Sequence, residues 1–195
     1  MREHGRHKRS PLSRARPTLA VMKSPREIEL MRAAGQVVRQ VLEAMRATVR
    51  PGTRLSDLGV MAEELIVNAG GEALFKGVTS PATRFPFPAA ICASVNDVVV
   101  HGIPDDRVLV EGDILSVDCG VRLKGYCGDA ATTLPVGRIS PQAQRLLEVT
   151  EKTLELALSQ MRPGRLWSEV AGMMQAHVES AGFSVVREFV GHGIG

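Results

Sequence analysis

An internal repeat with an offset of 112 residues constrains the fold of this 195-residue chain more than any other feature. Residues 50–57 (RPGTRLSD) are matched by residues 162–169 (RPGRLWSE), and the match continues through Met61 and Met173. In each copy a Pro-Gly turn precedes a serine, and about 13 residues later the segment ends at an Ala-Gly pair. The sequence therefore predicts one structural unit used twice.

Helices are predicted at matching places in the two units. Ser24-Pro25-Arg26-Glu27 is a capping box with proline at the first helical position, and apolar residues at helical spacing extend the helix over residues 25–48. In the second unit Ser140-Pro141 opens a helix over residues 141–161. The shorter helix of each unit is expected to be N-capped by the serine of the repeat, Ser56 or Ser168, and closed by glycine.

The period also predicts how much of the second unit the chain contains. In the first unit the helices are followed by strands over residues 89–135. Adding the period puts the corresponding strands beyond the last residue. We therefore expect residues 22–137 to form a complete half, and residues 138–195 to form an incomplete one.

Two hairpins are predicted in the first unit. The first joins residues 89–95 to residues 98–101 through Asn96-Asp97. The second joins residues 112–121 to residues 126–133 and carries two carboxylates, Asp118 and Asp129. A two-residue loop at 123–124 places these carboxylates directly opposite each other, whereas a loop one residue later places them diagonally on the same face.

Two carboxylates this close repel each other unless something compensates their charge. The compensation is either a shared proton or bound cations. Oxygen ligands with histidine suit divalent metals, and a close pair of carboxylates can bridge two ions. The alternative is two aspartates exposed to water at the end of a hairpin.

Two of the five histidines lie in sequence contexts that are typical of a ligand-binding or metal-binding site. His101 ends an apolar segment, and the rigid Gly102-Ile103-Pro104 turn that follows aims its ring. His192 is flanked by glycines, which permit close approach to a ligand, and is the candidate third metal ligand. The others are expected to be inert, because they lie in the N-terminal tail or on the polar face of a helix: His4, His7 and His177.

Composition and charge exclude several classes of protein. No apolar run approaches the roughly 18 residues that a membrane span needs. Three cysteines without a C-x-x-C pair, and the lack of an apolar signal segment, indicate a reducing cytoplasm. Aromatic residues make up 4%, which argues against binding of single-stranded nucleic acid by stacking.

The basic character of the chain resides in its N-terminal tail. Residues 1–20 carry a net charge of +5 and the remainder −2, so the body has no footprint for DNA. Residues 1–21 are predicted to be disordered. The tail is either an electrostatic arm for the ribosome surface or a solvated extension ahead of a working start at Met22.

The chain resembles the type I methionine aminopeptidases in five segments spread in order over residues 22–195. The segments are residues 23–31 (KSPREIELM), 94–104 (SVNDVVVHGIP), 112–118 (GDILSVD), 128–129 (GD) and 191–195 (GHGIG). The resemblance implies the pita-bread fold, an α+β architecture of two pseudo-symmetric α/β halves. It also implies a cytoplasmic enzyme, monomeric when complete, that removes the initiator methionine from nascent polypeptide N-termini.

The resemblance further implies the roles of individual residues. Asp118 would bind one of two divalent ions (Co, Mn, Fe or Zn), Asp129 would bridge both, and His192 would bind the other. His101 would be the catalytic residue that contacts the substrate near the cleaved amide, with Cys92 and Phe87 lining the methionine pocket. The metals would lower the pKa of a bridging water and polarise the scissile carbonyl.

The chain departs from the family pattern in two places. Residues 84–88 (RFPFP) replace an aromatic-His-Gly-aromatic-Pro stretch, which puts Arg84 where an apolar pocket wall is expected. The family's second substrate histidine and two metal-binding glutamates follow Gly-His-Gly-Ile-Gly, where this chain has none. We therefore expect the chain alone to be inactive.

Two other identities stay open. A non-catalytic truncated paralogue would keep the scaffold and bind a partner such as the ribosome. An Xaa-Pro peptidase or creatinase relative is disfavoured, because those proteins usually carry a large extra N-terminal domain.

Overall fold

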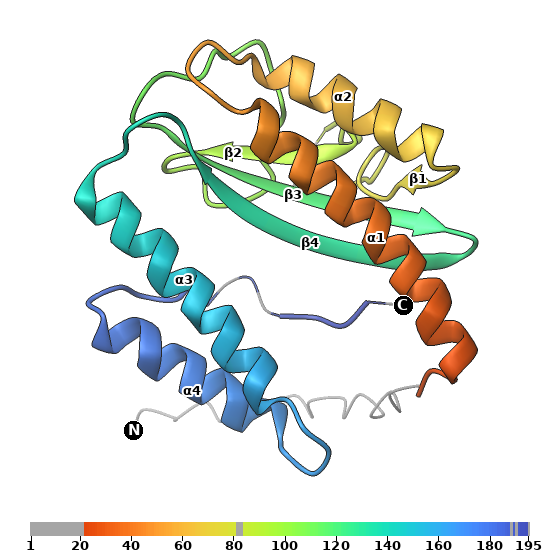
Figure 1. The fold of residues 1–195 in the computed structure, drawn as a ribbon, viewed down its shortest axis with the longest axis vertical. Helices are drawn as coiled ribbons and strands as arrows, with labels where there is room; N and C mark the ends of the chain where they lie inside the picture. The colour runs from red at the N-terminus through yellow and green to blue at the C-terminus, as the bar shows by residue number, and fades with distance from the viewer. Residues whose placement is uncertain (1–21, 81–83, 188, 190, 195) are drawn as a thin grey trace, which may run out of the picture.

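The structure is a computed structural model that describes residues 22–80, 84–187, 189 and 191–194. An antiparallel sheet is covered on one face by two helices, and a second pair of helices lies apart from it (Figure 1). The predicted basic tail, residues 1–21, lies outside the described residues. In chain order the elements are α1 (Pro25–Thr48), α2 (Leu55–Asn68), β1 (Glu72–Ala73), β2 (Ile91–Val95), β3 (Ile114–Leu123), β4 (Tyr126–Pro135), α3 (Pro141–Gln160) and α4 (Trp167–Ser180).

The first helix, α1, begins where the sequence predicts. The Glu27 amide donates to Ser24 Oγ at 3.4 Å, and the Glu27 carboxylate accepts from the Ser24 amide at 2.7 Å. This reciprocal pair confirms the capping box. The apolar face of α1 then packs across β3 and β4.

The repeat is confirmed in the backbone. Helix α2 begins at Leu55 and α4 at Trp167, and each has 14 residues, so the offset of 112 holds at both ends. The glycines that close the two helices, Gly70 and Gly182, both have a left-handed φ, at 74° and 84°.

The predicted serine caps are wrong. Ser56 and Ser168 lie inside the first turn of α2 and α4, and neither residue before the helices makes a side-chain cap. In α2 the first amides bond to a neighbouring loop instead: Leu55 donates to the carbonyl of Arg107 at 3.0 Å and Ser56 to that of Asp105 at 2.7 Å. Backbone carbonyls of a distant loop therefore accept the hydrogen bonds that a serine side chain was expected to accept.

Strand β3 is the centre of the sheet. It pairs with β1 and β2 on one side and with β4 on the other. The β3–β4 loop is Lys124-Gly125, with φ values of 51° and 83° as a type I′ turn requires. Asp118 consequently pairs with Ala131, so the later of the two predicted loop positions is correct and the directly opposed arrangement of the carboxylates is wrong.

The hairpin predicted around Asn96-Asp97 is also wrong, because residues 98–101 form no strand. Strand β2 pairs with β3 rather than with the residues that follow it. Asn96 has a φ of 55°, and its side chain bonds to Asp113 and to the Ile114 amide, which takes the chain out of the sheet. The valines that follow are exposed.

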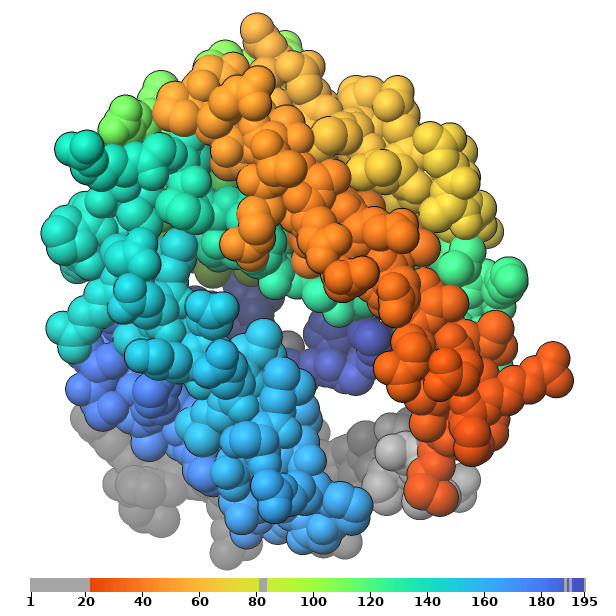
Figure 2. Space-filling view, in the orientation of Figure 1, coloured from red at the N-terminus to blue at the C-terminus, as the bar shows by residue number. Residues whose placement is uncertain are grey.

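The main hydrophobic core belongs to the first unit. Its buried members lie between Val37 and Val136 and come from α1, α2, the sheet and the adjoining loops. Helices α3 and α4 pack chiefly on each other, and Leu158 and Trp167 are 61% and 50% exposed. The surface is hollowed between α1 and α3, with the dark blue C-terminal segment at the floor of the hollow (Figure 2). No helix in the described ranges is long and apolar enough to cross a membrane.

Candidate metal and substrate site

The two candidate metal-binding carboxylates lie on the sheet face that α1 and α2 leave free. Asp129 pairs with Gly120, and Asp118 pairs with Ala131, so the two aspartates are diagonal neighbours on adjacent strands. Burial, the charge of Asp129 and a hydrogen bond with Asp129 raise the pKa of Asp118 to about 6, against the lowering effects of the Cys119 amide and His101. Two carboxylates placed like this repel each other when both are ionised, and a bound cation would reduce that repulsion.

Cys92 is the direct cross-strand partner of Asp118 in the β2–β3 ladder, and therefore shares its face. The side chain is 5% exposed. Burial, reinforced by the charges of Asp118 and Asp129, raises the pKa of the Cys92 thiol to about 12. The thiol consequently stays neutral and forms a soft, apolar wall beside the carboxylates.

His101 lies on the loop that follows β2. Its φ of 59° is unusual for a residue with a side chain. The imidazole packs edge-to-face on Phe189, with ring centroids 5.6 Å apart and planes at 89°. His101 lowers the pKa of Asp118, and its effect is the weakest of those that act on that carboxyl.

The candidate pocket residue Phe87 is half-buried and pairs with residues 77 and 78. Its amide donates to the Val78 carbonyl, and its carbonyl accepts from the Gly77 amide, both at 2.8 Å. Arg84 is exposed, and its guanidinium lies 5.6 Å from the centre of the Phe85 ring.

Sequence analysis missed Phe75, which covers the site face beside Asp129. A Cβ built on Gly120, the cross-strand partner of Asp129, would lie 2.8 Å from a Phe75 ring carbon. The aromatic ring therefore occupies the space that a glycine leaves open. The apolar Ala73-Leu74-Phe75 run after α2 was the available signal.

His192 is exposed, and its Nδ1 lies 3.1 Å from the Gly193 carbonyl oxygen. Within the described ranges, no three or more histidine, cysteine, aspartate or glutamate side chains form a group able to hold a metal ion. The strand pairing brings Asp118, Asp129 and Cys92 together, and neither His101 nor His192 joins the two carboxylates in a group of that kind.

The sequence predicts that His177 lies on the polar face of a helix, but the structure differs. Its Nε2 is buried without a hydrogen-bond partner among the described residues.

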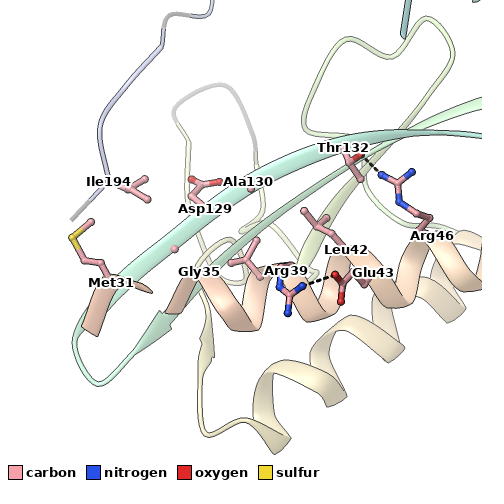
Figure 3. A pocket seen from close by; sticks show the side chains of 12 residues that line it. Met31, Gly35, Arg39, Leu42, Glu43, Arg46, Asp129, Ala130, Thr132 and Ile194 are labelled. Carbon is pink, nitrogen blue, oxygen red and sulfur yellow. Dashed lines mark hydrogen bonds and ion pairs between the residues drawn. The ribbon is translucent and has the colours of Figure 1, made fainter. Parts of the chain in front are cut away.

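A groove of about 450 Å³ lies between α1 and the edge strand β4. Asp129 forms part of one wall, with Met31 of α1 and Ile194 of the C-terminal segment beside it (Figure 3). On the α1 side of the groove, Arg39 is paired with Glu43 at 2.9 Å (Figure 3). The C-terminal segment thus approaches the site through Ile194, two residues after His192.

The donor set fits divalent cations in part. Two adjacent carboxylates provide several oxygen ligands and a net charge that a divalent ion would neutralise. Imidazole ligands suit the same metals, and His101 is a histidine that acts electrostatically on Asp118.

The comparisons with known proteins agree with this geometry. A sequence profile of metallopeptidase family M24 matches residues 29–195. Methionine aminopeptidase 1 of Bacillus subtilis is 44% identical over 177 residues, which are 91% of this chain and 69% of that protein. A methionine aminopeptidase of Helicobacter pylori is 42% identical over 174 residues, which are 89% and 66% of the two chains. The chain thus spans about two thirds of the length of these relatives.

Solved structures extend the comparison. The crystal structure of methionine aminopeptidase from Thermotoga maritima matches with a TM-score of 0.83 and 38% identity, and covers 88% of this chain and 67% of that one. Prolidase from Pyrococcus furiosus matches with a TM-score of 0.70 at 19% identity, over 82% of this chain and 44% of that one, and shares the fold alone. The architecture is the pita-bread fold. The chain therefore belongs to metallopeptidase family M24 and, within it, to the methionine aminopeptidases.

Proposed function

We propose that the protein to which this chain belongs removes the N-terminal methionine from nascent polypeptides. The observation that carries the proposal is the pair of Asp118 and Asp129, two carboxylates on one sheet face whose mutual repulsion favours bound cations. The names of the relatives support the substrate, since each is a methionine aminopeptidase.

In this proposal Asp118 and Asp129 would hold two divalent ions, from among Co, Mn, Fe and Zn, with Asp129 as the candidate ligand common to both. His192 is the further candidate ligand from this chain. Bound there, such ions would lower the pKa of a water molecule and polarise the scissile carbonyl. Further ligands would be needed, because two carboxylates bind an ion only weakly in an open geometry.

The remaining residues bind the substrate. His101 beside Asp118 is suited to hydrogen-bond the amide that is cleaved. Cys92 and Phe87 line the methionine side-chain pocket, where a neutral, buried thiol suits a thioether. The protein would act in the cytoplasm as a monomer, and the basic residues 1–21 would supply any contact with the ribosome.

Binding of Mn²⁺ to the purified chain tests the metal site. Calorimetric titration should show weak binding that Asp118→Asn or Asp129→Asn lowers by at least about tenfold, because each substitution removes an anionic ligand. Asp97→Asn is the matched control, because it changes the charge equally at an exposed position. Equal Mn²⁺ affinity in all four proteins would refute the proposed site.

Methionine release tests the reaction separately. We expect no release of methionine from a Met-Ala-Ser peptide by residues 1–195 with Co²⁺, Mn²⁺ or Fe²⁺ supplied, because the described residues gather no third metal ligand at the carboxylates. In the full-length protein, turnover that survives Asp129→Asn would show that the reaction does not use the proposed ligands.

A further inference from the structure

The loop that carries His101 is tied to the sheet at both of its ends. It leaves β2 at Asn96 and returns to the same strand at Gly102. Between these points the side chains are exposed. The described contacts there are the hydrogen bond from the Val98 amide to the Val95 carbonyl at 3.2 Å and the packing of His101 on Phe189, and the other hydrogen bonds of the loop lie at the two anchors.

The first anchor joins Asn96 to Asp113. Asn96 Nδ2 donates to Asp113 Oδ1 at 2.7 Å, and Asn96 Oδ1 accepts from the Ile114 amide at 2.9 Å. Asp113 is 5% exposed, and its Oδ2 accepts from the Val110 amide at 3.0 Å. Burial alone would raise the pKa of Asp113, but these hydrogen bonds and Arg107 outweigh it, and the pKa lies below its ordinary value.

The second anchor lies directly beside His101. The Gly102 carbonyl accepts from the Ala93 amide at 2.8 Å, and the Gly102 amide donates to Ser94 Oγ at 3.0 Å. A Cβ on Gly102 would lie 2.2 Å from the Ala93 carbonyl oxygen, so no side chain fits there. His101, one residue earlier, is thereby held in its left-handed conformation against the edge of the sheet.

We propose that Asn96 and Asp113 are positioning residues that fix the His101 imidazole beside Asp118. The proposal rests on the proposed function, in which His101 contacts the substrate. Asn96 and Asp113 lie at the end of the loop that is far from His101. They tie that end of the loop to β3, the strand that carries Asp118. Gly102 fixes the near end, so the six residues from Asn96 to His101 span two points of one rigid sheet.

A swap of the two partners separates positioning from simple loss of stability. In Asp113→Asn, the single amide oxygen can accept from Asn96 Nδ2 or from the Val110 amide but not from both, so the new NH2 group faces one of these donors. In Asn96→Asp, two carboxylates would face each other. The double variant Asn96→Asp with Asp113→Asn restores the hydrogen bonds to the Ile114 and Val110 amides and the one between the two side chains, whose direction is reversed. It loses the 3.5 Å contact of Arg107 with Asp113 Oδ1, and aspartate tolerates a left-handed φ. Asn96→Gly is the mild variant, because it removes the side chain and keeps the backbone preference.

The readouts are made on the 195-residue chain by NMR. The nuclear Overhauser effect between the His101 and Phe189 rings reports the place of the imidazole, and amide exchange at Gly102 reports the near anchor. We expect wild type, the swap and Asp97→Asn to show the ring contact and slow exchange. Asp113→Asn and Asn96→Gly should lose the ring contact, and Gly102 exchange should accelerate by about tenfold or more.

Two results would overturn the proposal. One is a ring contact that persists in folded Asn96→Gly, whatever becomes of Asp113→Asn. The other is a swap that folds without recovering the contact. Neither readout uses cations or peptide cleavage, so failure of the proposed function would appear in the Mn²⁺ and methionine-release measurements and leave this result unchanged.

Discussion

Cys92 faces Asp118 directly across the β2–β3 ladder, and the pKa of its thiol is raised to about 12 by burial and then by Asp118 and Asp129. At pH 8 the thiolate is therefore scarcely populated. Iodoacetamide should alkylate the half-buried Cys127 before Cys92, because thiolate population and access both limit the reaction. Peptide mass spectrometry of the labelled chain measures both rates.

In urea the three thiols should react at similar rates, which controls for differences of local sequence. Alkylation of Cys92 as fast as that of Cys127 in the folded chain would contradict the described burial.

The raised pKa of Asp118 predicts how stability depends on pH. The folded-state pKa of about 6 exceeds the ordinary value of 3.8, so the folded chain binds the proton more tightly than the unfolded chain does. This contribution to the free energy of unfolding is present below about pH 4 and is lost as the pH rises through about 6. It amounts to roughly 1–2 kcal/mol after screening by solvent.

Urea unfolding at several pH values checks this dependence. Asp118→Asn should flatten the curve between pH 4 and 6, whereas Asp97→Asn should leave it unchanged. Saturating Mn²⁺ should oppose the loss of stability near pH 7, because the cation binds the ionised pair. Identical pH profiles for wild type and Asp118→Asn would contradict the prediction.

Among the described glycines of the sheet, Gly128 of β4 has the closest contact with α1. A Cβ there would lie 2.6 Å from the Gly35 amide nitrogen of α1, so Gly128→Ala must displace the helix. We expect a loss of about 1–3 kcal/mol in the free energy of unfolding. Denaturant titration measures it.

Gly35→Ala is the matched control from the same contact. A Cβ on Gly35 meets nothing within 4 Å, so the substitution should stabilise α1 by about 0.5–1 kcal/mol through its helix propensity. A destabilising Gly35→Ala, or a neutral Gly128→Ala, would show that α1 sits differently on β4.

The elements that the sequence predicted correctly are those with local causes. The capping box of α1 and the paired helices of the repeat depend on residues within a few positions of each other. The β3–β4 register was also available locally, because Lys124-Gly125 suits a type I′ turn whose second position favours glycine. That preference selects the diagonal arrangement of Asp118 and Asp129 over the opposed one.

The errors arose where distant residues replace local interactions. Asn96-Asp97 resembles a hairpin turn, but the Asn96 side chain bonds to Asp113, 17 residues away, and the chain leaves the sheet. Ser56 resembles an N-cap, but the carbonyls near Asp105 satisfy the first amides of α2. The Asn96–Asp113 contact, which explains why the hairpin prediction is wrong, also anchors the loop that carries His101. This prediction therefore failed next to the candidate site.

The two Ser-Pro caps test how far the halves of the chain differ in stability. Ser24 and Ser140 accept from the amides of Glu27 and Ala143 at 3.4 and 3.1 Å, so serine-to-alanine substitution removes a side-chain cap from each helix. Ser24→Ala also removes the hydrogen bond that Ser24 Oγ donates to the Glu27 carboxylate at 2.7 Å. Ser24→Ala should lower the free energy of global unfolding by about 1 kcal/mol, because α1 belongs to the main core.

Ser140→Ala should instead increase amide exchange within α3 and leave the protection of β3 unchanged. Helix α3 contributes no residue to the main core cluster and packs chiefly on α4, so it can open locally while the sheet stays folded. Hydrogen exchange with mass spectrometry separates the two effects by peptide. An equal loss of β3 protection in both variants would show that α3 unfolds only together with the first unit, and that the two units share one cooperative transition.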